Sequence, residues 1–349
     1  MSQQYWEVQN NAKVHEGDVE LDKNIIAQLP AGAKVLSSRG HGASNWNTTA
    51  RVDVEIGGEP KSCFLKLTTG PKAQAMLQGE YESMLLINQF VPEFSPKPLA
   101  WGRCADSTDR CFLLFEFHAL EKGPPAIPCF TNAVAQLHQR SRRAAHHPKP
   151  PPKKKFGFHI TTFNGTLAQD NTWTETWEEF YIRGMRRMLQ LEEKAGGPCE
   201  ELKRLSEPFL AMVVPRLLRP LETGGRRIEP VLLHGDLWLG NVATQDATGE
   251  PLMFDSSAFW GHHEYELATL RPLADDWARE CVESYHALLP KSEPTEDWEG
   301  RNALYAVRVI IHDTALYPDE AHFRPMLIEE MRKLVEQYGR GHGEDGTNT

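Results

Sequence analysis

The stretch LLHGDLWLGNV, residues 232–242, places a histidine, an aspartate and an asparagine among hydrophobic residues, with two glycines that break any regular periodicity. Asp236 is followed five residues later by Asn241, and Asp255 ends the apolar run PLMFD nineteen residues after Asp236. Phosphoryl transfer requires a carboxylate that orients a hydroxyl group, together with an amide and a second carboxylate that hold Mg²⁺. The spacing therefore predicts Asp236 as the base and Asn241 and Asp255 as metal ligands.

An upstream lysine and glutamate supply what a kinase needs to hold the nucleotide. Lys66 ends the alternating strand SCFLK, and Glu80 lies in the helix that follows. An ion pair between two such residues fixes the amine over the α and β phosphates of ATP. Before them, the segment SSRGHGASN offers Gly40 and Gly42, small residues that let backbone N–H groups approach a phosphate. Each piece alone is common, but the ordered set is hard to obtain by chance and predicts an ATP-binding kinase.

Three histidines, His234, His262 and His263, flank these acids and raise the alternative of a zinc site. The sequence has neither an HExxH motif nor a closely spaced cysteine pair to accompany them. We therefore expect His234, two residues before Asp236, to orient the backbone of the site through hydrogen bonds.

Strand patterns dominate the first third of the chain. The segment ARVDVEIGGEPKSCFLKL, residues 50–67, alternates polar and apolar side chains and turns at Gly57-Gly58, which predicts a hairpin with one buried face. A helical pattern follows over residues 72–90, and residues 95–102 and 111–117 supply further strands. Sheet, helix and sheet predict a compact α+β lobe.

Helical patterns dominate from Asn132 onward. They cover residues 132–145, 176–193, 207–221, 305–312 and 326–337. The second of these carries an apolar stripe that is typical of a helix packed on a core, namely Trp177, Phe180, Tyr181, Gly184, Met188 and Leu191. The polar, glycine-rich end, residues 339–349, predicts a flexible tail.

Composition limits the classes of function. With 349 residues, 40% of them hydrophobic and 25% charged, the chain is an ordinary globular protein and is long enough for two domains. Its net charge of −10 disfavours a broad surface for nucleic acid or an anionic membrane. The six cysteines include no CxxC pair, and no window resembles a signal peptide or a membrane span. We expect reduced thiols, a cytoplasmic location, and neither a nucleic-acid nor a membrane partner.

One segment departs from this acidic composition. Residues 142–155 combine prolines with lysines, arginines and histidines. Because proline denies the backbone helix and sheet hydrogen bonds, we expect an extended surface loop. The alternative is a docking patch for an acidic or protein substrate.

Three longer motifs carry a family resemblance. HGDLWLGN, MFDSSAFWGHHEYELA and FGFHITTFNGTLAQDNTWTETWEEFY together resemble the fructosamine kinase (ketosamine 3-kinase) family, and most of all its fungal-type members. The resemblance extends over roughly residues 37–334. In this chain Asp255 is followed by two serines where many members have proline and alanine, and the glycine loop is a divergent version, but the metal ligand is retained.

The resemblance implies a bilobal, protein-kinase-like fold related to aminoglycoside phosphotransferases. We expect a nucleotide-binding lobe over residues 1–117, a catalytic and substrate-binding lobe over 118–338, and a tail over 339–349. ATP would bind between the lobes, with its adenine at the hinge backbone of Glu116 and Phe117. The family phosphorylates the C3 hydroxyl of a ketosamine, and elimination of the 3-phosphate then releases the amine and reverses glycation.

Carried onto this sequence, the resemblance also implies a set of substrate residues. Trp238 would form an apolar wall against the sugar, since aromatic faces suit sugar C–H surfaces. The residues expected to reach the amine-bearing part of the substrate are Gln169, Asn171, His262, Glu264 and His312. The sequence does not distinguish fructosamine from ribulosamine adducts, nor small ketosamines from glycated proteins, and a monomer is expected.

Two other classes of function remain open. A kinase of another small hydroxylated metabolite, such as an aminoglycoside or choline, would share every ATP-site residue and differ only in the acceptor pocket. A binding protein on a kinase fold would have lost the base or a metal ligand, and this sequence retains both.

Overall fold

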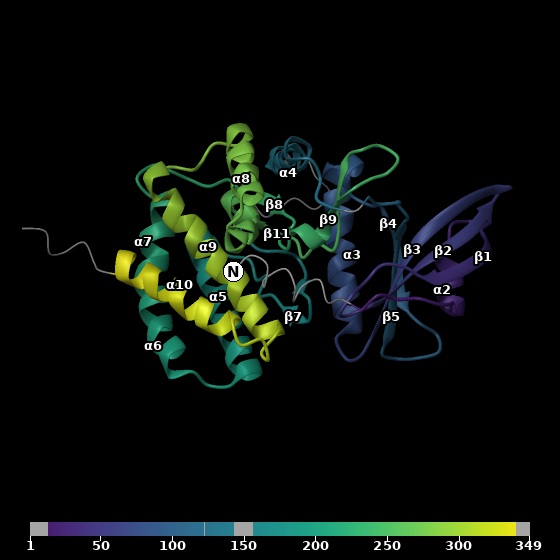
Figure 1. Ribbon diagram of the computed structural model, residues 1–349, viewed down its shortest axis with the longest axis horizontal. Coiled ribbons are helices and arrows are strands. Elements are labelled where there is room, and N and C mark those ends of the chain that lie inside the picture. Colours follow the sequence, from purple (N-terminus) through teal and green to yellow (C-terminus); the bar gives the residue numbers. More distant parts are fainter. Residues whose placement is uncertain (1–12, 122, 143–155, 340–349) are drawn as a thin grey trace, which may run out of the picture. The chain divides into compact units, whose positions relative to one another are not determined.

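The computed structural model describes residues 13–121, 123–142 and 156–339 (Figure 1). The chain divides into two compact units: Met1–Ser141 with Ile160–Ala168 and His234–Phe259, and Arg142–His159 with Gln169–Leu233 and Trp260–Thr349. The predicted loop 142–155 and tail 339–349 lie outside the described residues, except for Arg142 and Gly339. A sheet in the first unit and a predominantly helical second unit confirm the α+β class, and the division after residue 117 stays a prediction.

The first unit is built on a five-stranded antiparallel sheet. Its strands lie in the order β1 (Lys34–Gly40), β2 (Thr48–Ile56), β3 (Glu59–Thr69), β5 (Arg110–Glu116) and β4 (Pro98–Arg103). The predicted hairpin is β2–β3, and its last residue pair is Ile56 with Glu59. Gly57 and Gly58 between them have φ values of 61° and 87°, the left-handed conformation that a two-residue hairpin turn requires and glycine adopts without strain.

Alternation along β2 and β3 separates a core face from a functional face. The core side chains pack with those of α2 (Lys23–Gln28) and are nearly inaccessible: Ala50, Val52, Val54, Cys63, Leu65 and Leu67. Successive side chains of a strand point to opposite faces. Lys66, between two core residues, therefore points to the other face, where α3 (Ala73–Phe90) packs against β3, β4 and β5.

A second long helix and several short elements complete the first unit. They are α4 (Ile127–Arg142), the hairpin of β6 (Phe163–Asn164) with β7 (Leu167–Ala168), the hairpin of β9 (Val242–Thr244) with β10 (Pro251–Met253), and 3-10 turns at Pro92–Phe94 and Leu239–Asn241. The β9–β10 hairpin lies within the motif residues 236–255, which belong to the first unit. Lys66 and Asp255, 189 positions apart, therefore lie in the same unit.

Helices make up most of the second unit. They are α5 (Trp177–Gly196), α6 (Glu200–Pro208), α7 (Val214–Leu218), α8 (Asp276–Leu288), α9 (Trp298–Leu316) and α10 (Phe323–Tyr338), and β8 (Val231–Leu233) pairs with β11 (Phe259–Gly261). Helix α9 packs against α5, α10 and the 3-10 segment His263–Leu273. Nearly every residue of α9 from Gly300 to Ala315 is buried. Each polar side chain on this helix therefore needs a partner inside the protein or from a ligand.

The helix predicted over residues 207–221 is wrong as a single element. Helix α6 ends at Pro208, a π-helical turn spans Phe209–Val213, α7 spans Val214–Leu218, and a 3-10 turn spans Arg219–Glu222. Pro208, Pro215 and Pro220 fall at these changes. Proline lacks an N–H group and clashes with the preceding turn, so it interrupts the regular hydrogen-bond pattern.

Candidate active site

A buried lysine lies between two carboxylates in the first unit. Lys66 is 3% exposed, and its Nζ lies 2.6 Å from Oε1 of Glu80 on α3. The same Nζ forms an ion pair with the carboxylate of Asp255. The structure therefore brings together three residues that the sequence analysis assigned to one nucleotide site.

The charges in this cluster do not balance. Burial lowers the pKa of Lys66, but Asp255 and Glu80 outweigh burial and raise the pKa above its usual value. Burial raises the pKa of Glu80, Lys66 opposes that rise, and the charge of Asp255 adds to it. One ammonium group thus faces two carboxylates, and a further cation beside Asp255 would relieve the excess negative charge.

Hydrogen bonds hold the loop that carries Asp236 against the loop that carries Asp255. Nε2 of His234 lies 2.9 Å from the carbonyl oxygen of Phe254 and must donate, because a carbonyl can only accept. The N–H of Ser257 and the hydroxyl of Ser256 both donate to the carbonyl oxygen of His234, at 3.0 and 2.8 Å. The predicted backbone-orienting role of His234 matches these contacts.

Asn241 connects the predicted base to this pair of loops. Its Nδ2 donates to the carbonyl oxygen of Asp236 at 2.8 Å and to Oδ2 of the same residue at 3.1 Å. Its backbone carbonyl accepts from the N–H of Phe254 at 3.0 Å. Since Nδ2 faces these acceptors, Oδ1 of Asn241 faces away from them and is available to a cation.

Two backbone positions fix the shape of these loops. Gly235 has a φ of +79°, and a Cβ atom there would lie 2.5 Å from the carbonyl oxygen of Ser257, so only glycine fits. Asp255 has a φ of 60°, which is uncommon for a residue with a side chain. Such strained conformations concentrate at functional sites.

A pocket of about 270 Å³ lies beside the Lys66 cluster, wholly within the first unit. Its lining includes Lys66 and Asp255, the predicted hinge residues Glu116 and Phe117, and Gly42. The N–H of Glu116 donates to the carbonyl of Lys97 at 3.0 Å, and the N–H of Phe117 donates to the carbonyl of Ser62 at 3.3 Å. An adenine contact at these two residues would therefore use their carbonyl oxygens.

The two predicted loop glycines have different surroundings. Gly42 lines the pocket and has a φ of +81°. Gly40 does not appear in the lining, and a Cβ atom at this position would lie 2.6 Å from the backbone of His15. Close packing against residues 15–16 is thus sufficient to explain the glycine at position 40.

Trp238 lies next to the base but outside the pocket lining. Its N–H donates to the carbonyl of Asp236 at 3.1 Å, and its ring covers Gly240, where a Cβ atom would overlap the indole. Gly240 does line the pocket. The predicted contact of Trp238 with a sugar stays a prediction.

In the second unit, two of the predicted substrate residues have their polar atoms occupied. His262 is fully buried, with Nδ1 at 2.9 Å from the hydroxyl of Tyr305 and Nε2 at 2.8 Å from that of Ser292. Glu264 forms a two-pronged ion pair with Arg301 at 2.7 and 3.0 Å. His262, His263 and Glu264 offer ligand atoms within 4.8 Å of one another, but these contacts favour a structural role for the buried pair.

Two other predicted substrate residues meet at a residue that the sequence analysis missed. Arg308 of α9 donates from Nη2 to Oε1 of Gln169 at 3.4 Å and from Nη1 to Nε2 of His312. All three are at most 7% exposed, and Asn171 nearby in sequence is 4% exposed. The available signal was an arginine within the apolar run LYAVRVIIHDTAL, four residues before His312.

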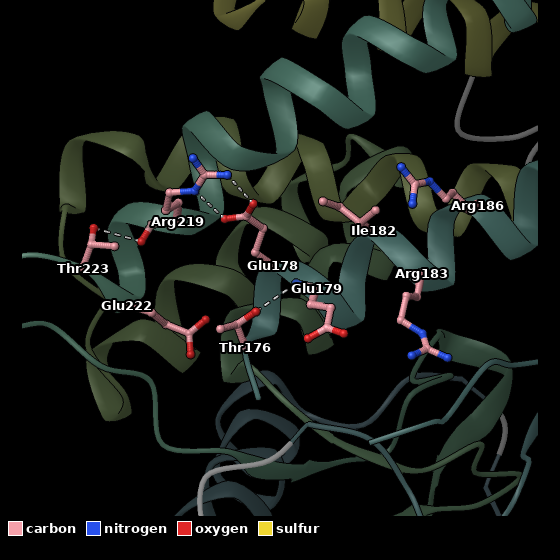
Figure 2. Close-up of a pocket in the computed structure, with 9 residues that line it drawn as sticks. All are labelled: Thr176, Glu178, Glu179, Ile182, Arg183, Arg186, Arg219, Glu222 and Thr223. Atoms are coloured by element: carbon pink, nitrogen blue, oxygen red, sulfur yellow. Dashed lines mark hydrogen bonds and ion pairs between the residues drawn. The ribbon is translucent and has the colours of Figure 1, made fainter. Parts of the chain in front are cut away.

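A second hollow, of about 540 Å³, lies in the second unit and carries charges of both signs (Figure 2). Arg219 donates from Nε and Nη2 to the carboxylate of Glu178 at 3.0 and 2.8 Å. Arg183, on the same helix as Glu178, forms an ion pair with Asp170 at 3.3 Å. These arginines have protein carboxylates as partners, whereas Arg308 has no such partner among the residues that the structure describes.

Comparison with known proteins identifies similar chains. The sequence profile of the fructosamine kinase family matches residues 35–335. Ketosamine-3-kinase of Mus musculus is 40% identical over 258 residues, which cover 69% of this chain and 78% of that protein. The chloroplastic protein-ribulosamine 3-kinase of Oryza sativa subsp. japonica is 27% identical over 275 residues, 77% of this chain and 70% of that protein.

A solved structure supports the fold. The aminoglycoside phosphotransferase APH(4)-Ia, crystallised in a ternary complex with AMP-PNP and hygromycin B, superimposes with a TM-score of 0.54 at 15% identity. The match covers 93% of this chain and 100% of that chain.

Proposed function

Because the chain belongs to the fructosamine kinase family, we propose that it is an ATP-dependent kinase that phosphorylates the C3 hydroxyl group of a ketosamine. The observation that carries this proposal is the cluster in which Lys66 contacts both Glu80 and Asp255, beside a pocket in the same unit. Phosphoryl transfer depends mainly on positioning and on charge neutralisation, and this cluster supplies groups for both.

ATP would occupy the pocket, with its phosphates directed toward Lys66. The ion pair with Glu80 holds the ammonium group in place, so that it can contact the α and β phosphates. Gly42, with its left-handed backbone, exposes the loop 41–44 to the nucleotide. Backbone carbonyls of Glu116 and Phe117 would contact the adenine.

The donor set fits Mg²⁺. Asp255 offers a carboxylate whose side chain is 44% exposed, and Asn241 offers an amide oxygen turned away from Asp236. Mg²⁺ prefers oxygen ligands and often takes few from the protein. A bound Mg²⁺ would neutralise phosphate charge and the surplus charge of Asp255.

Asp236 would orient the acceptor and take its proton. The oxygen at C3 of the ketosamine attacks the γ phosphorus, the bond from that phosphorus to the β-phosphate oxygen breaks, and ADP leaves. The hydroxyl proton passes to the carboxylate of Asp236. Asn241 keeps that carboxylate in place through its contact at 3.1 Å.

Finer aspects of the proposal concern partners and location. We propose small ketosamines and glycated proteins as substrates, a monomeric enzyme, and a cytoplasmic location where its cysteines stay reduced. In the described part of the chain the cysteines are free, and no helix there has the length and apolar character of a membrane span.

The test is a substrate panel with ATP and Mg²⁺. We expect phosphate transfer to fructosamine or ribulosamine adducts of a small amine, detected by ADP release and by ³¹P NMR of the C3 ester. Aminoglycosides and choline are the competing acceptors. Transfer to one of those, with none to any ketosamine, would exclude the proposed acceptor class.

The base is tested by Asp236→Asn. We expect retained ATP binding and a kcat about 10²–10⁴-fold lower, the usual contribution of a positioned base. Asp246→Asn, an exposed aspartate on the neighbouring hairpin, is the matched control. Near-normal turnover in Asp236→Asn would remove that residue from the mechanism.

A further inference from the structure

Helix α9 carries two buried arginines with different partners. Arg301 is fully buried, and its guanidinium donates to both carboxylate oxygens of Glu264. Its other contacts are the carbonyl oxygens of Ser292 and Pro294, each at 2.7 Å. The charge of Arg301 is therefore neutralised inside the protein.

Arg308, two helical turns further along α9, has neutral partners. It is 5% exposed and donates to the amide oxygen of Gln169 and to Nε2 of His312. Burial and the charge of Arg308 lower the pKa of His312 well below its usual value, so this ring is neutral at pH 7. Over residues 13–121, 123–142 and 156–339, no carboxylate forms an ion pair with Arg308.

The other titratable groups that act on Arg308 are two tyrosines. Tyr181 and Tyr265 are its tyrosine neighbours, and burial raises the pKa of Tyr181 well above its usual value. An arginine stays protonated in proteins. A buried charge without a counter-ion is costly, and apolar residues often replace such charges without loss of stability. Arg183 and Arg219, in contrast, pair with Asp170 and Glu178, and Figure 2 shows Arg219 facing Glu178.

Donor groups remain available in this cluster. A guanidinium group has five N–H donors, and two contacts of Arg308 are made to protein atoms. His312 accepts at Nε2, so the proton of the neutral ring is on Nδ1, which has no partner among the described residues. His312 is 7% exposed. A positive charge surrounded by further donors matches an oxyanion.

We propose that Arg308, with His312 and Gln169, binds an oxyanionic group of the ketosamine substrate. This inference rests on the proposed function, since Gln169 and His312 are residues expected to contact the substrate. The oxyanion has two sources: a carboxylate on the amine-bearing part, as in an amino-acid adduct, or a phosphate ester on the sugar.

Matched substrates separate these sources. The fructose adducts of glycine and of glycinamide differ in one carboxylate, and the 6-phosphate of the glycinamide adduct places the anion on the sugar instead. We expect kcat/KM of the native enzyme for one acidic adduct to exceed that for the neutral adduct about 10- to 100-fold, the range for a hydrogen bond to a charged group. The acidic adduct with the higher kcat/KM shows whether the site binds the carboxylate of the amine part or the phosphate of the sugar.

Variants connect that preference to Arg308. In Arg308→Met we expect the ratio of kcat/KM for the acidic adduct to that for the neutral adduct to fall to about one, mainly because KM for the acidic adduct rises. In Arg308→Lys we expect the same ratio to fall to an intermediate value. Arg183→Met is the matched control, because this arginine pairs with Asp170 next to Gln169, and it should keep the native ratio.

Thermal unfolding gives a readout that does not depend on turnover. Without ligand, Arg308→Met should melt at or above the native temperature, because it removes a buried charge that has no carboxylate partner in the described ranges of the chain. The favoured acidic adduct should raise the melting temperature of the native protein but not that of Arg308→Met. If Arg308→Met fails to fold, the inference is still tested by Arg308→Lys and by the ratio of acidic to neutral kcat/KM of the native enzyme.

Two results would overturn the inference. One is equal kcat/KM for the neutral adduct and both acidic adducts. The other is an acid preference that Arg308→Met retains. If no adduct is phosphorylated, the proposed function fails, and the thermal unfolding measurements then test the oxyanion site by themselves. A melting-temperature increase that requires Arg308 would support the site, and the absence of any increase would refute it.

Discussion

Lys66 holds two carboxylates together, so its removal should affect both activity and stability. In Lys66→Met we expect kcat/KM for ATP to fall by about 10²-fold or more, in the range for loss of a preorganised charged group. We also expect a loss of about 3–5 kcal/mol of stability, because breaking a buried ion pair leaves Glu80 without its cation. Steady-state kinetics and urea unfolding measure the two effects.

The control for that variant is Lys61→Met. Lys61 is an exposed residue of the same strand, so it reports the general effect of losing a lysine from β3. Unaltered ATP kinetics in Lys66→Met would show that Lys66 and its partner Glu80 are not part of the nucleotide site.

His312 should make the protein less stable in mild acid. Its pKa in the folded state is depressed well below 6.5 by burial and by Arg308. Below pH 6.5 the ring of His312 becomes protonated in the unfolded chain but stays neutral in the folded protein. The free energy of unfolding therefore decreases as the pH falls. The expected contribution is up to about 1.4 kcal/mol for each pH unit below 6.5.

Urea unfolding between pH 5 and 7 measures this effect. His312→Asn should show a shallower decline than the native protein, and His159→Asn, at an exposed position, should not. An identical slope in native protein and His312→Asn would show that folding does not lower the pKa of this ring.

At the level of secondary-structure elements, helix α3 must pass close to another segment to place Glu80. A Cβ atom at Gly79 would lie 2.7 Å from the carbonyl oxygen of Thr161. Alanine favours a helix over glycine by about 1 kcal/mol, but overpacking typically costs about 1–3 kcal/mol. We expect Gly79→Ala to be less stable than the native protein and to have a raised KM for ATP, because Glu80 must move.

Gln78→Ala, in the same turn, tests whether the effect is specific. Gln78 is only partly buried, so its truncation should change unfolding free energy and KM little. A Gly79→Ala protein that is more stable than the native one would show that helix propensity outweighs the close approach.

At the level of the whole molecule, nucleotide should stabilise the first unit directly. The pocket draws on the segments 41–44, 115–118 and 252–255, all of that unit. We expect ATP with Mg²⁺ to slow amide hydrogen exchange in these segments. At a hundred times its Kd, a ligand adds about 2.7 kcal/mol of stability.

Mass-resolved hydrogen exchange measures this protection, with Lys66→Met as the variant that should lose it. Protection that appears exclusively in peptides of α6 to α10 would place the nucleotide elsewhere and contradict the pocket assignment.

The sequence alone determined the elements and groups that depend on local order. The β2–β3 hairpin followed from alternation and two glycines, because a strand pattern and a turn are set by neighbouring residues. The proposed phosphoryl-transfer set of Asp236, Asn241 and Asp255 was predicted from residue types that few other chemistries need together.

Tertiary structure alone decided which long-range partners each polar side chain has. Nothing local predicts that both ring nitrogens of His262 contact the hydroxyls of Tyr305 and Ser292, or that Gly40 packs against His15. Nor does it predict that, within the described part of the chain, Arg301 pairs with a carboxylate and Arg308 does not. Burial and counter-ions are set by segments distant in sequence that folding brings into contact. Those contacts determine whether a buried charge is stabilised, because its free energy depends on its surroundings rather than on its position in the chain.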